Sequence, residues 1–143
     1  MDERKALFEA VVEACPKHLK VIANVGKMAT EHSIELAWHA EGLAVSVISS
    51  VPPFYFSYNQ DEIVRYYLDL AEAVNVPVLI YNIPTMSGVT FSMDSLNRLL
   101  EDGRIMGLKH TSYVFSITDA DTGDSILNPD HIGATVMACS LFM

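Results

Sequence analysis

Cysteine, positive charge and long apolar runs are all scarce in this sequence, and each shortage excludes a class of protein. Its 143 residues contain two cysteines, Cys15 and Cys139, without C-x-x-C spacing, so we expect buried thiols in a reducing compartment and no structural zinc site. Nine Lys and Arg residues against eighteen Asp and Glu residues leave a net charge of -9, which argues against nucleic acid and anionic membranes as partners. No stretch approaches the roughly 18 consecutive apolar residues of a membrane helix, so we expect a cytoplasmic protein.

The sequence also lacks the short motifs that hold phosphates, metals or an activated serine. No G-x-G-x-x-G or G-x-x-x-x-G-K-S/T segment follows an expected strand, so the usual phosphate-binding loops are missing. Ser49 and Ser50 lack the G-x-S-x-G context of a serine hydrolase. The histidines are scattered without metal-ligand spacing: they are His18, His32, His39, His110 and His131. We therefore expect no metal site.

What the sequence does contain is a globular composition, with 50% hydrophobic and 19% charged residues, arranged as one domain over residues 1–143. Amphipathic segments alternate with short apolar runs rich in β-branched residues, a pattern typical of βα units around a parallel sheet. Strands are expected at residues 21–26, 44–51, 78–81, 105–109 and 125–128. Helices are expected at residues 2–15, from 30, from 59, from 92 to 103 and at 134–142.

Helical spacing predicts which side of each helix is buried. The first helix should bury Leu7, Val11, Ala14 and Cys15, and the second Ile34, Ala37 and Trp38. Asn59 should cap the third helix together with Glu62, and this helix should bury Ile63, Tyr67, Leu70 and Val74. Ser92 should cap the fourth, which carries Met93, Leu96, Leu99 and Leu100.

Repeated βα units of this kind form either an open doubly wound sheet or a (β/α)8 barrel. The absence of phosphate-binding loops favours the barrel. A complete barrel takes about 250 residues, or about 31 per unit, so 143 residues supply fewer than five of its eight units. The expected fold is therefore a partial (β/α)8 TIM barrel.

Lys109 is the most informative position, because it ends an otherwise apolar strand at residues 105–109. A lysine in a dry pocket has a lowered pKa, and its neutral amine can attack a carbonyl to form an imine. Tyr81 ends the preceding strand, so both side chains should face one cavity. A phenol beside a cation can act as a general acid and base. The alternatives are a lysine that extends past the sheet to water and a tyrosine that is part of the core.

Other polar and aromatic residues follow the strand ends. Thr111 and Ser112 offer hydroxyls for a substrate hydroxyl or carboxylate, or else cap a turn. An aromatic cluster at residues 53–56 lies in a loop after a strand, where binding residues or an oligomer contact are both expected.

Two motifs in this order resemble the N-acetylneuraminate lyase and dihydrodipicolinate synthase family. They are Y-N-I-P at residues 81–84, followed by S-G-V at 87–89, and G-L-K-H-T-S at 107–112. Residues 3–5, 21–26 and 51–56 are also similar to family segments, so the resemblance spans residues 2–112. The I-P after Y-N and the K-x-T-S around the lysine are more similar to the sialic acid lyases than to the dihydrodipicolinate synthases.

The resemblance implies a class I aldolase without metal or dissociable cofactor. Lys109 would form an imine with N-acetylneuraminate, and retro-aldol cleavage would release pyruvate and N-acetylmannosamine. Tyr81 would transfer the proton, Thr111 would hold a substrate hydroxyl, and Tyr55 matches the family tyrosine near the active site and the subunit boundary. The implied partners are these small molecules and further copies of the chain in a homotetramer.

The sequence also departs from the family pattern. The G-S/T-T-G-E segment that holds the pyruvate carboxylate, the first two strands and the eighth strand are not found, which leaves roughly strands three to seven of the barrel. Residues 127–131 lack the glycine and acidic pair of the sugar-binding segment, and Ala44 and Ser46 replace the usual Gly and Asp. Two further hypotheses therefore stand beside the lyase. One is an inactive truncated homologue that binds keto acids or associates with full-length subunits, and the other is a small open α/β binding domain.

Overall fold

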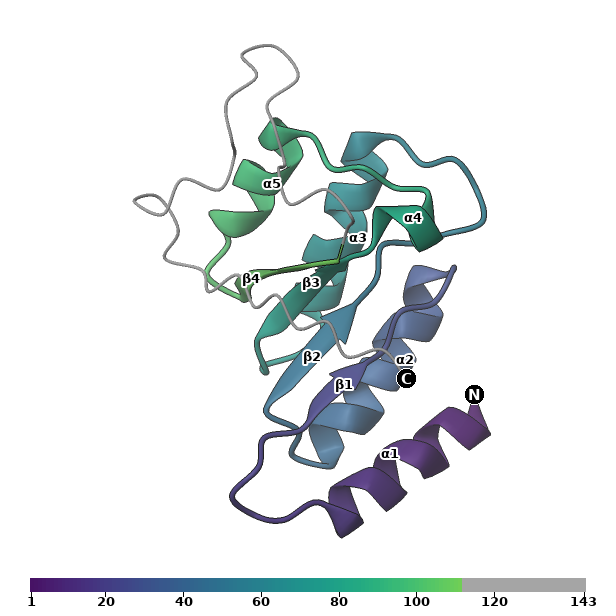
Figure 1. Cartoon of the computed structure of the whole chain (residues 1–143), viewed down its shortest axis with the longest axis vertical. Helices are drawn as coiled ribbons and strands as arrows, with labels where there is room; N and C mark the ends of the chain where they lie inside the picture. Colours follow the sequence, from purple (N-terminus) through teal and green to yellow (C-terminus); the bar gives the residue numbers. More distant parts are fainter. Residues whose placement is uncertain (112–143) are drawn as a thin grey trace.

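The computed structural model describes residues 1–111, which form an α/β unit built on one parallel sheet (Figure 1). The elements follow one another as α1 (Asp2–Ala14), β1 (Ile22–Asn24), α2 (Thr30–Gly42), β2 (Val47–Ser50), α3 (Gln60–Glu72), β3 (Val78–Asn82), α4 (Pro84–Ser87), α5 (Met93–Leu100) and β4 (Ile105–His110). The expected strand at 125–128, the expected helix at 134–142, Ser112, Cys139 and His131 lie outside the described residues.

The four strands are parallel and lie in the order β1-β2-β3-β4, so each βα unit sits beside the next one in the chain. A doubly wound sheet reverses its strand order part-way, whereas a barrel does not. The observed order is therefore that of consecutive barrel units. Helices α2, α3 and α5 pack against β2, β3 and β4 respectively, and all three cover the same face of the sheet (Figure 1).

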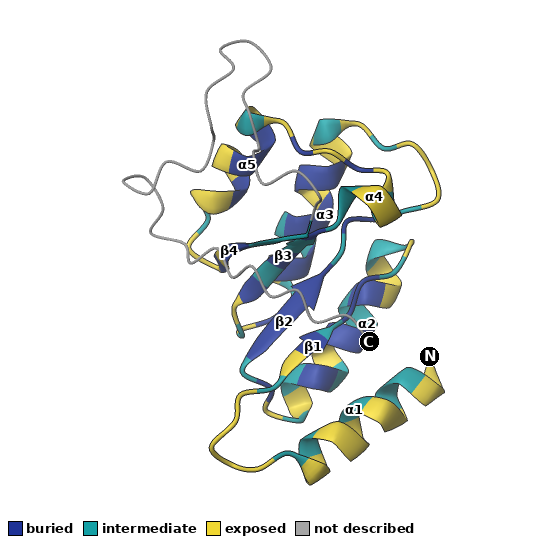
Figure 2. Ribbon diagram, in the orientation of Figure 1, coloured by how far each residue is buried: buried dark blue, intermediate teal, exposed yellow. Residues whose placement is uncertain are grey.

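The core lies between the sheet and these helices (Figure 2). Side chains alternate along β3: Val78, Ile80 and Asn82 are buried against the helices, while Leu79 and Tyr81 on the other face are half-buried. From the helices the core receives large side chains that are almost completely buried, including Leu36, Ile63, Tyr67, Leu70 and Leu99. The apolar stripe predicted for α3 is confirmed by this packing.

The predicted helix starts at Asn59 and Ser92 are also confirmed. The Asn59 side chain accepts a hydrogen bond from the backbone of Glu62 at 2.9 Å, and the Glu62 carboxylate accepts one from the Asn59 backbone at 2.8 Å. Ser92 accepts a hydrogen bond from the Ser95 backbone at 3.1 Å. Both side chains satisfy backbone N–H groups that a helix start otherwise leaves without a partner.

The predictions for α1 and for part of α2 are wrong. No residue of α1 is buried, Leu7 and Val11 are exposed, and Cys15 after the helix is half-buried. The reason is that α1 packs on α2 rather than under the sheet, so its contact side is formed by Phe8 and Val12. Trp38 is also exposed, although its indole nitrogen donates a hydrogen bond to the Ala73 carbonyl at 2.8 Å.

A short helix, α4, lies between β3 and α5, where the sequence pattern predicts neither a helix nor a strand. Its first residue is Pro84, whose missing N–H costs nothing at a helix start. Gly88 ends it with φ 70°, a left-handed conformation that glycine adopts readily. Within residues 1–111, no helix is long and apolar enough to cross a membrane.

Candidate functional site

The expected pair of Tyr81 and Lys109 lies at the carboxyl ends of β3 and β4. The two residues are direct partners in the β3–β4 ladder, so their side chains leave the same face of the sheet, opposite the helices. The Lys109 ammonium nitrogen lies 3.7 Å from the centroid of the Tyr81 ring. At this distance the ring attracts a cation placed over its face. Both side chains are half-buried.

The next residues along the two strands, Asn82 and His110, contact each other on the opposite face of the sheet. The Asn82 amide nitrogen lies 2.9 Å from His110 Nδ1, and the backbone N–H of Thr111 donates to the Asn82 carbonyl at 2.8 Å. Asn82 is only 4% exposed. These bonds tie the end of β4 to the end of β3, directly beside Lys109. Thr111, the third expected site residue, is therefore held next to the lysine through its backbone.

Tyr55 lies in the loop after β2 and is the most exposed of the expected site residues, at 82%. Its φ is 84°, an unusual conformation for a bulky side chain. Its ring contacts Phe56 edge to face, with centroids 4.9 Å apart. Strained residues of this kind concentrate at functional sites and contacts. Together with the α4 region, this loop lines a hollow of about 620 Å³ that includes neither Lys109 nor Tyr81.

A chain of hydrogen bonds beneath these loops links the ends of β1 and β2 to both neighbouring helices. The Lys27 backbone donates to Ser33 Oγ at 3.0 Å, Ser33 Oγ lies 2.8 Å from Tyr66 Oη, and Tyr66 Oη lies 2.7 Å from Ser50 Oγ. Ser50 Oγ in turn donates to the Val51 carbonyl at 2.7 Å. Ser33 and Ser50 are fully buried.

Each hydroxyl in this series of hydrogen bonds has one proton to donate, and this fixes which partner donates in each bond. The single hydroxyl proton of Ser50 goes to Val51, so Ser50 accepts from Tyr66. Tyr66 has then used its own proton and accepts from Ser33. Burial raises the pKa of Tyr66, while its bonds to the two serines act in the opposite direction. Burial also raises the pKa of the neighbouring Tyr67.

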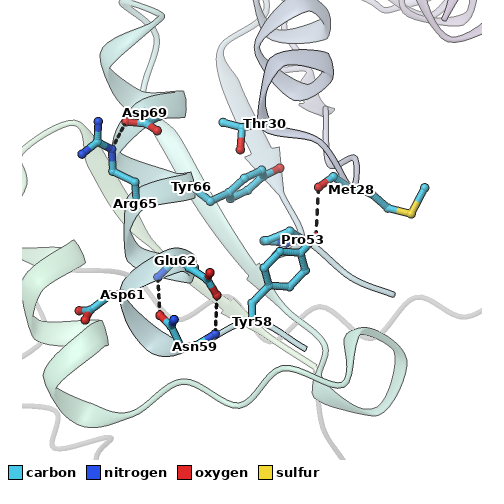
Figure 3. Close-up of a pocket in the computed structure, with 10 residues that line it drawn as sticks. All are labelled: Met28, Thr30, Pro53, Tyr58, Asn59, Asp61, Glu62, Arg65, Tyr66 and Asp69. Atoms are coloured by element: carbon cyan, nitrogen blue, oxygen red, sulfur yellow. Dashed lines mark hydrogen bonds and ion pairs between the residues drawn. The ribbon is translucent and has the colours of Figure 1, made fainter. Parts of the chain in front are cut away.

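A second hollow, of about 410 Å³, lies between the start of α2 and α3 (Figure 3). Its apolar wall includes Met28, Pro53, Tyr58 and Tyr66. Its carboxylates are all engaged within the protein: Asp69 pairs with Arg65 at 2.6 Å, Asp61 with Arg98 at 2.7 Å, and Glu62 caps α3. Across the described part of the chain, no three His, Cys, Asp or Glu side chains are grouped to hold a metal ion.

Sequence reasoning found the strand-end pair but missed the hydrogen-bond chain. Tyr81, Lys109 and Thr111 are brought together, and Tyr55 contacts Phe56 instead. Ser33, Ser50 and Tyr66 gave no signal, because serine and tyrosine are common in both helices and strands, and Ser33 and Tyr66 are 33 residues apart in the sequence. The Asn82 and His110 contact follows from strand register, which the sequence leaves open.

A family model described as the dihydrodipicolinate synthetase family matches residues 1–124. The chain belongs to this family. Among its relatives are the N-acetylneuraminate lyase of Clostridium perfringens, 33% identical over 118 residues, and the 4-hydroxy-tetrahydrodipicolinate synthase of a Sulfurovum species, 38% identical over 113 residues. These matches cover 82% and 78% of this chain, but only 41% and 38% of the relatives.

Solved structures give the same result. The crystal structure of CdNal from Clostridium difficile in complex with mannosamine matches with a TM-score of 0.77 and 35% identity, over 80% of this chain and 39% of that protein. The chain thus spans about two fifths of the length of the curated and solved relatives it matches. With its unreversed parallel sheet, it is a partial (β/α)8 barrel of this family, as the sequence predicted.

Proposed function

We propose that Lys109 is the Schiff-base lysine of a class I aldolase, with Tyr81 as its proton-transfer partner. The observation that supports this most directly is the 3.7 Å separation between the Lys109 ammonium nitrogen and the Tyr81 ring, at the carboxyl ends of adjacent parallel strands. Barrel enzymes carry their catalytic residues at this end of the sheet. The named relatives, a lyase and a synthase, are consistent with this class of chemistry.

The proposed reaction begins with the neutral amine of Lys109 attacking the ketone of a 2-keto acid. Tyr81 gives its phenol proton to the hydroxyl of this adduct, which leaves as water and produces the phenolate. The iminium that remains accepts the electron pair of the carbon–carbon bond when that bond breaks. The hydroxyl on the departing carbon gives its proton to the Tyr81 phenolate and becomes an aldehyde. The resulting enamine takes a proton on carbon, and water then hydrolyses the imine to release pyruvate and the free lysine.

For the substrate we propose N-acetylneuraminate, cleaved to pyruvate and N-acetylmannosamine. The support is the I-P after Tyr81-Asn82 and the Thr111 two residues after Lys109, which resemble the lyase branch. Thr111 Oγ1 would hold a substrate hydroxyl beside the lysine. Tyr55, with Phe56 63% exposed beside it, would meet another copy of the chain at a subunit boundary.

The test is imine trapping with the purified chain. Incubation with pyruvate and borohydride should add a reduced pyruvyl group to Lys109, detected by intact mass and peptide mapping. Lys109→Arg should abolish the adduct, and Lys20→Arg, which changes an exposed lysine before β1, should leave it unchanged. A folded chain without the adduct would refute the catalytic proposal.

One observation favours a second candidate function, an inactive homologue that binds keto acids or associates with full-length subunits. Residues 127–131 lack the glycine and the acidic pair of the family's sugar-binding segment, so the groups that would bind the sugar there are absent from this stretch of sequence. The two candidates differ in one measurement. Adduct formation together with release of N-acetylmannosamine from N-acetylneuraminate indicates the lyase, whereas an adduct without sugar release indicates the keto-acid-binding homologue.

A further inference from the structure

The β3–β4 ladder contains one irregularity, immediately before the residues proposed for catalysis. Val78 pairs with Ile105, but the next residue, Leu79, pairs with Gly107. Met106 is therefore an extra residue on β4, which is the definition of a β-bulge. From Gly107 onward the ladder is regular again, and Tyr81 pairs with Lys109.

The bulge decides which face of the sheet receives Lys109. Residues of a strand alternate between its faces, so Ile105 and Lys109, four residues apart, would share a face in a regular strand. Ile105 faces the helices and is buried, so a regular β4 would direct Lys109 into the core. The extra residue reverses the alternation, and Ile105 and Leu108 are both buried on the helix side.

Gly107 has the backbone conformation that this bulge needs. Its φ is 152°, a value that residues with a side chain rarely adopt. Met106, the extra residue, is 47% exposed, so its side chain contributes little to the core. The sequence therefore places glycine where the strand must deviate, and an exposed residue where one is added.

We propose that Met106 and Gly107 form a positioning device that turns Lys109 away from the helices and onto the Tyr81 ring. Gly107 is a positioning residue, since it acts through Lys109 and touches no reacting atom. The proposal rests on the function assigned to Lys109 above, but its geometric part can be measured without any reaction.

The test compares three variants of the full chain: Gly107→Ala, deletion of Met106, and both changes together. Gly107→Ala should disfavour the bulge, so that β4 either shifts by one residue or frays. Deletion of Met106 removes the extra residue and leaves a regular strand in which Lys109 still pairs with Tyr81. The double variant should therefore regain the contact, because a regular strand no longer needs glycine. Gly103→Ala is the control, since a Cβ there meets no atom within 4 Å.

The first readout is the NMR shift of the Lys109 ε-methylene protons, which a ring 3.7 Å from the amine moves upfield. We expect wild type, Gly103→Ala, the deletion and the double variant to show this shift, and Gly107→Ala to lose it. The second readout is the rate of pyruvyl adduct formation per folded molecule, which should fall about 100-fold in Gly107→Ala alone.

The outcomes separate this inference from the proposed function. If folded Gly107→Ala keeps the ring-induced shift, or if the folded double variant fails to regain it, the positioning role is refuted. If the folded deletion variant loses the shift, the register argument is wrong. If the shifts behave as expected but wild type forms no adduct, the bulge positions Lys109 as inferred and the catalytic proposal fails.

Discussion

Replacing Tyr66 by phenylalanine tests the buried hydrogen-bond chain. The change removes one oxygen and two hydrogen bonds, from Ser33 at 2.8 Å and to Ser50 at 2.7 Å. A buried hydrogen bond contributes about 0.5–1.5 kcal/mol, and an unsatisfied buried polar group costs about 1–3 kcal/mol. Ser33 can redirect its proton to the carbonyl of Ala29 one helical turn earlier, which limits the loss. We expect the free energy of unfolding to fall by about 2–3 kcal/mol.

The matched control is Tyr67→Phe, one residue further along α3. Tyr67 is equally buried, but its hydroxyl makes a single hydrogen bond, to the Ser50 carbonyl at 2.9 Å. Its loss should cost about 1 kcal/mol. Urea unfolding followed by circular dichroism measures both variants. The reasoning is refuted if Tyr66→Phe costs no more than Tyr67→Phe, or if Ser33→Ala and Tyr66→Phe have additive effects, since bonded partners should couple.

Further stability predictions concern the backbone and one ion pair. Ala44 has φ 58° and is exposed, so Ala44→Gly should raise the free energy of unfolding by about 0.5–1 kcal/mol, measured in urea. A Cβ on Gly26 would lie 2.7 Å from Val51 Cγ2 and 3.1 Å from the Val51 backbone nitrogen, so Gly26→Ala should lower the free energy of unfolding by about 1–3 kcal/mol. Gly42→Ala should not lower it, because a Cβ on Gly42 meets no atom within 4 Å. Hydrogen bonds from Arg104 lower the pKa of Asp102 from 3.8 to about 2. The lowered pKa stabilises the folded state above pH 3.8, and this contribution is lost as the pH falls toward 2. Asp102→Asn should therefore reduce the pH dependence of the free energy of unfolding between pH 3.8 and 2, measured by acid unfolding.

Much of the fold could be predicted because its signals are local. Proline, glycine and capping residues mark the ends of elements, and Asn59 with Glu62 forms the predicted capping box. Burial could be predicted where a helix packs directly on the sheet, as with Tyr67 on α3. It failed for α1, because an apolar stripe does not reveal whether its neighbour is a sheet or the outer side of another helix. Leu7 and Phe8 are adjacent in sequence, and only Phe8 packs inward.

The candidate site, like the fold, could be predicted from the sequence only in part. That Tyr81 and Lys109 end neighbouring strands follows from the sequence, because parallel strands in a βα series lie side by side. That they share a face does not follow, because counting alternate residues from Ile105 places Lys109 on the wrong side. Only the pairing of Leu79 with Gly107 shows the extra residue that corrects the count. A bulge is defined by the pairing of two strands, so the sequence of β4 alone does not show it. The only local sign of it in β4 is Gly107, whose positive φ favours glycine.

The contact between Lys109 and Tyr81 depends on a small part of the chain. Both residues lie within residues 78–110, where β3 and β4 pair directly and α5 packs beside them. The Asn82 and His110 contact joins the same two strand ends on the opposite face, and the backbone bond from Thr111 to Asn82 continues the ladder between them. By contrast, α1 packs mainly on α2 and has no buried residue, so its contribution is to stability rather than to this geometry. Changes in the bulge should therefore alter the reactivity of each folded molecule, whereas changes in α1 should alter only the fraction that is folded.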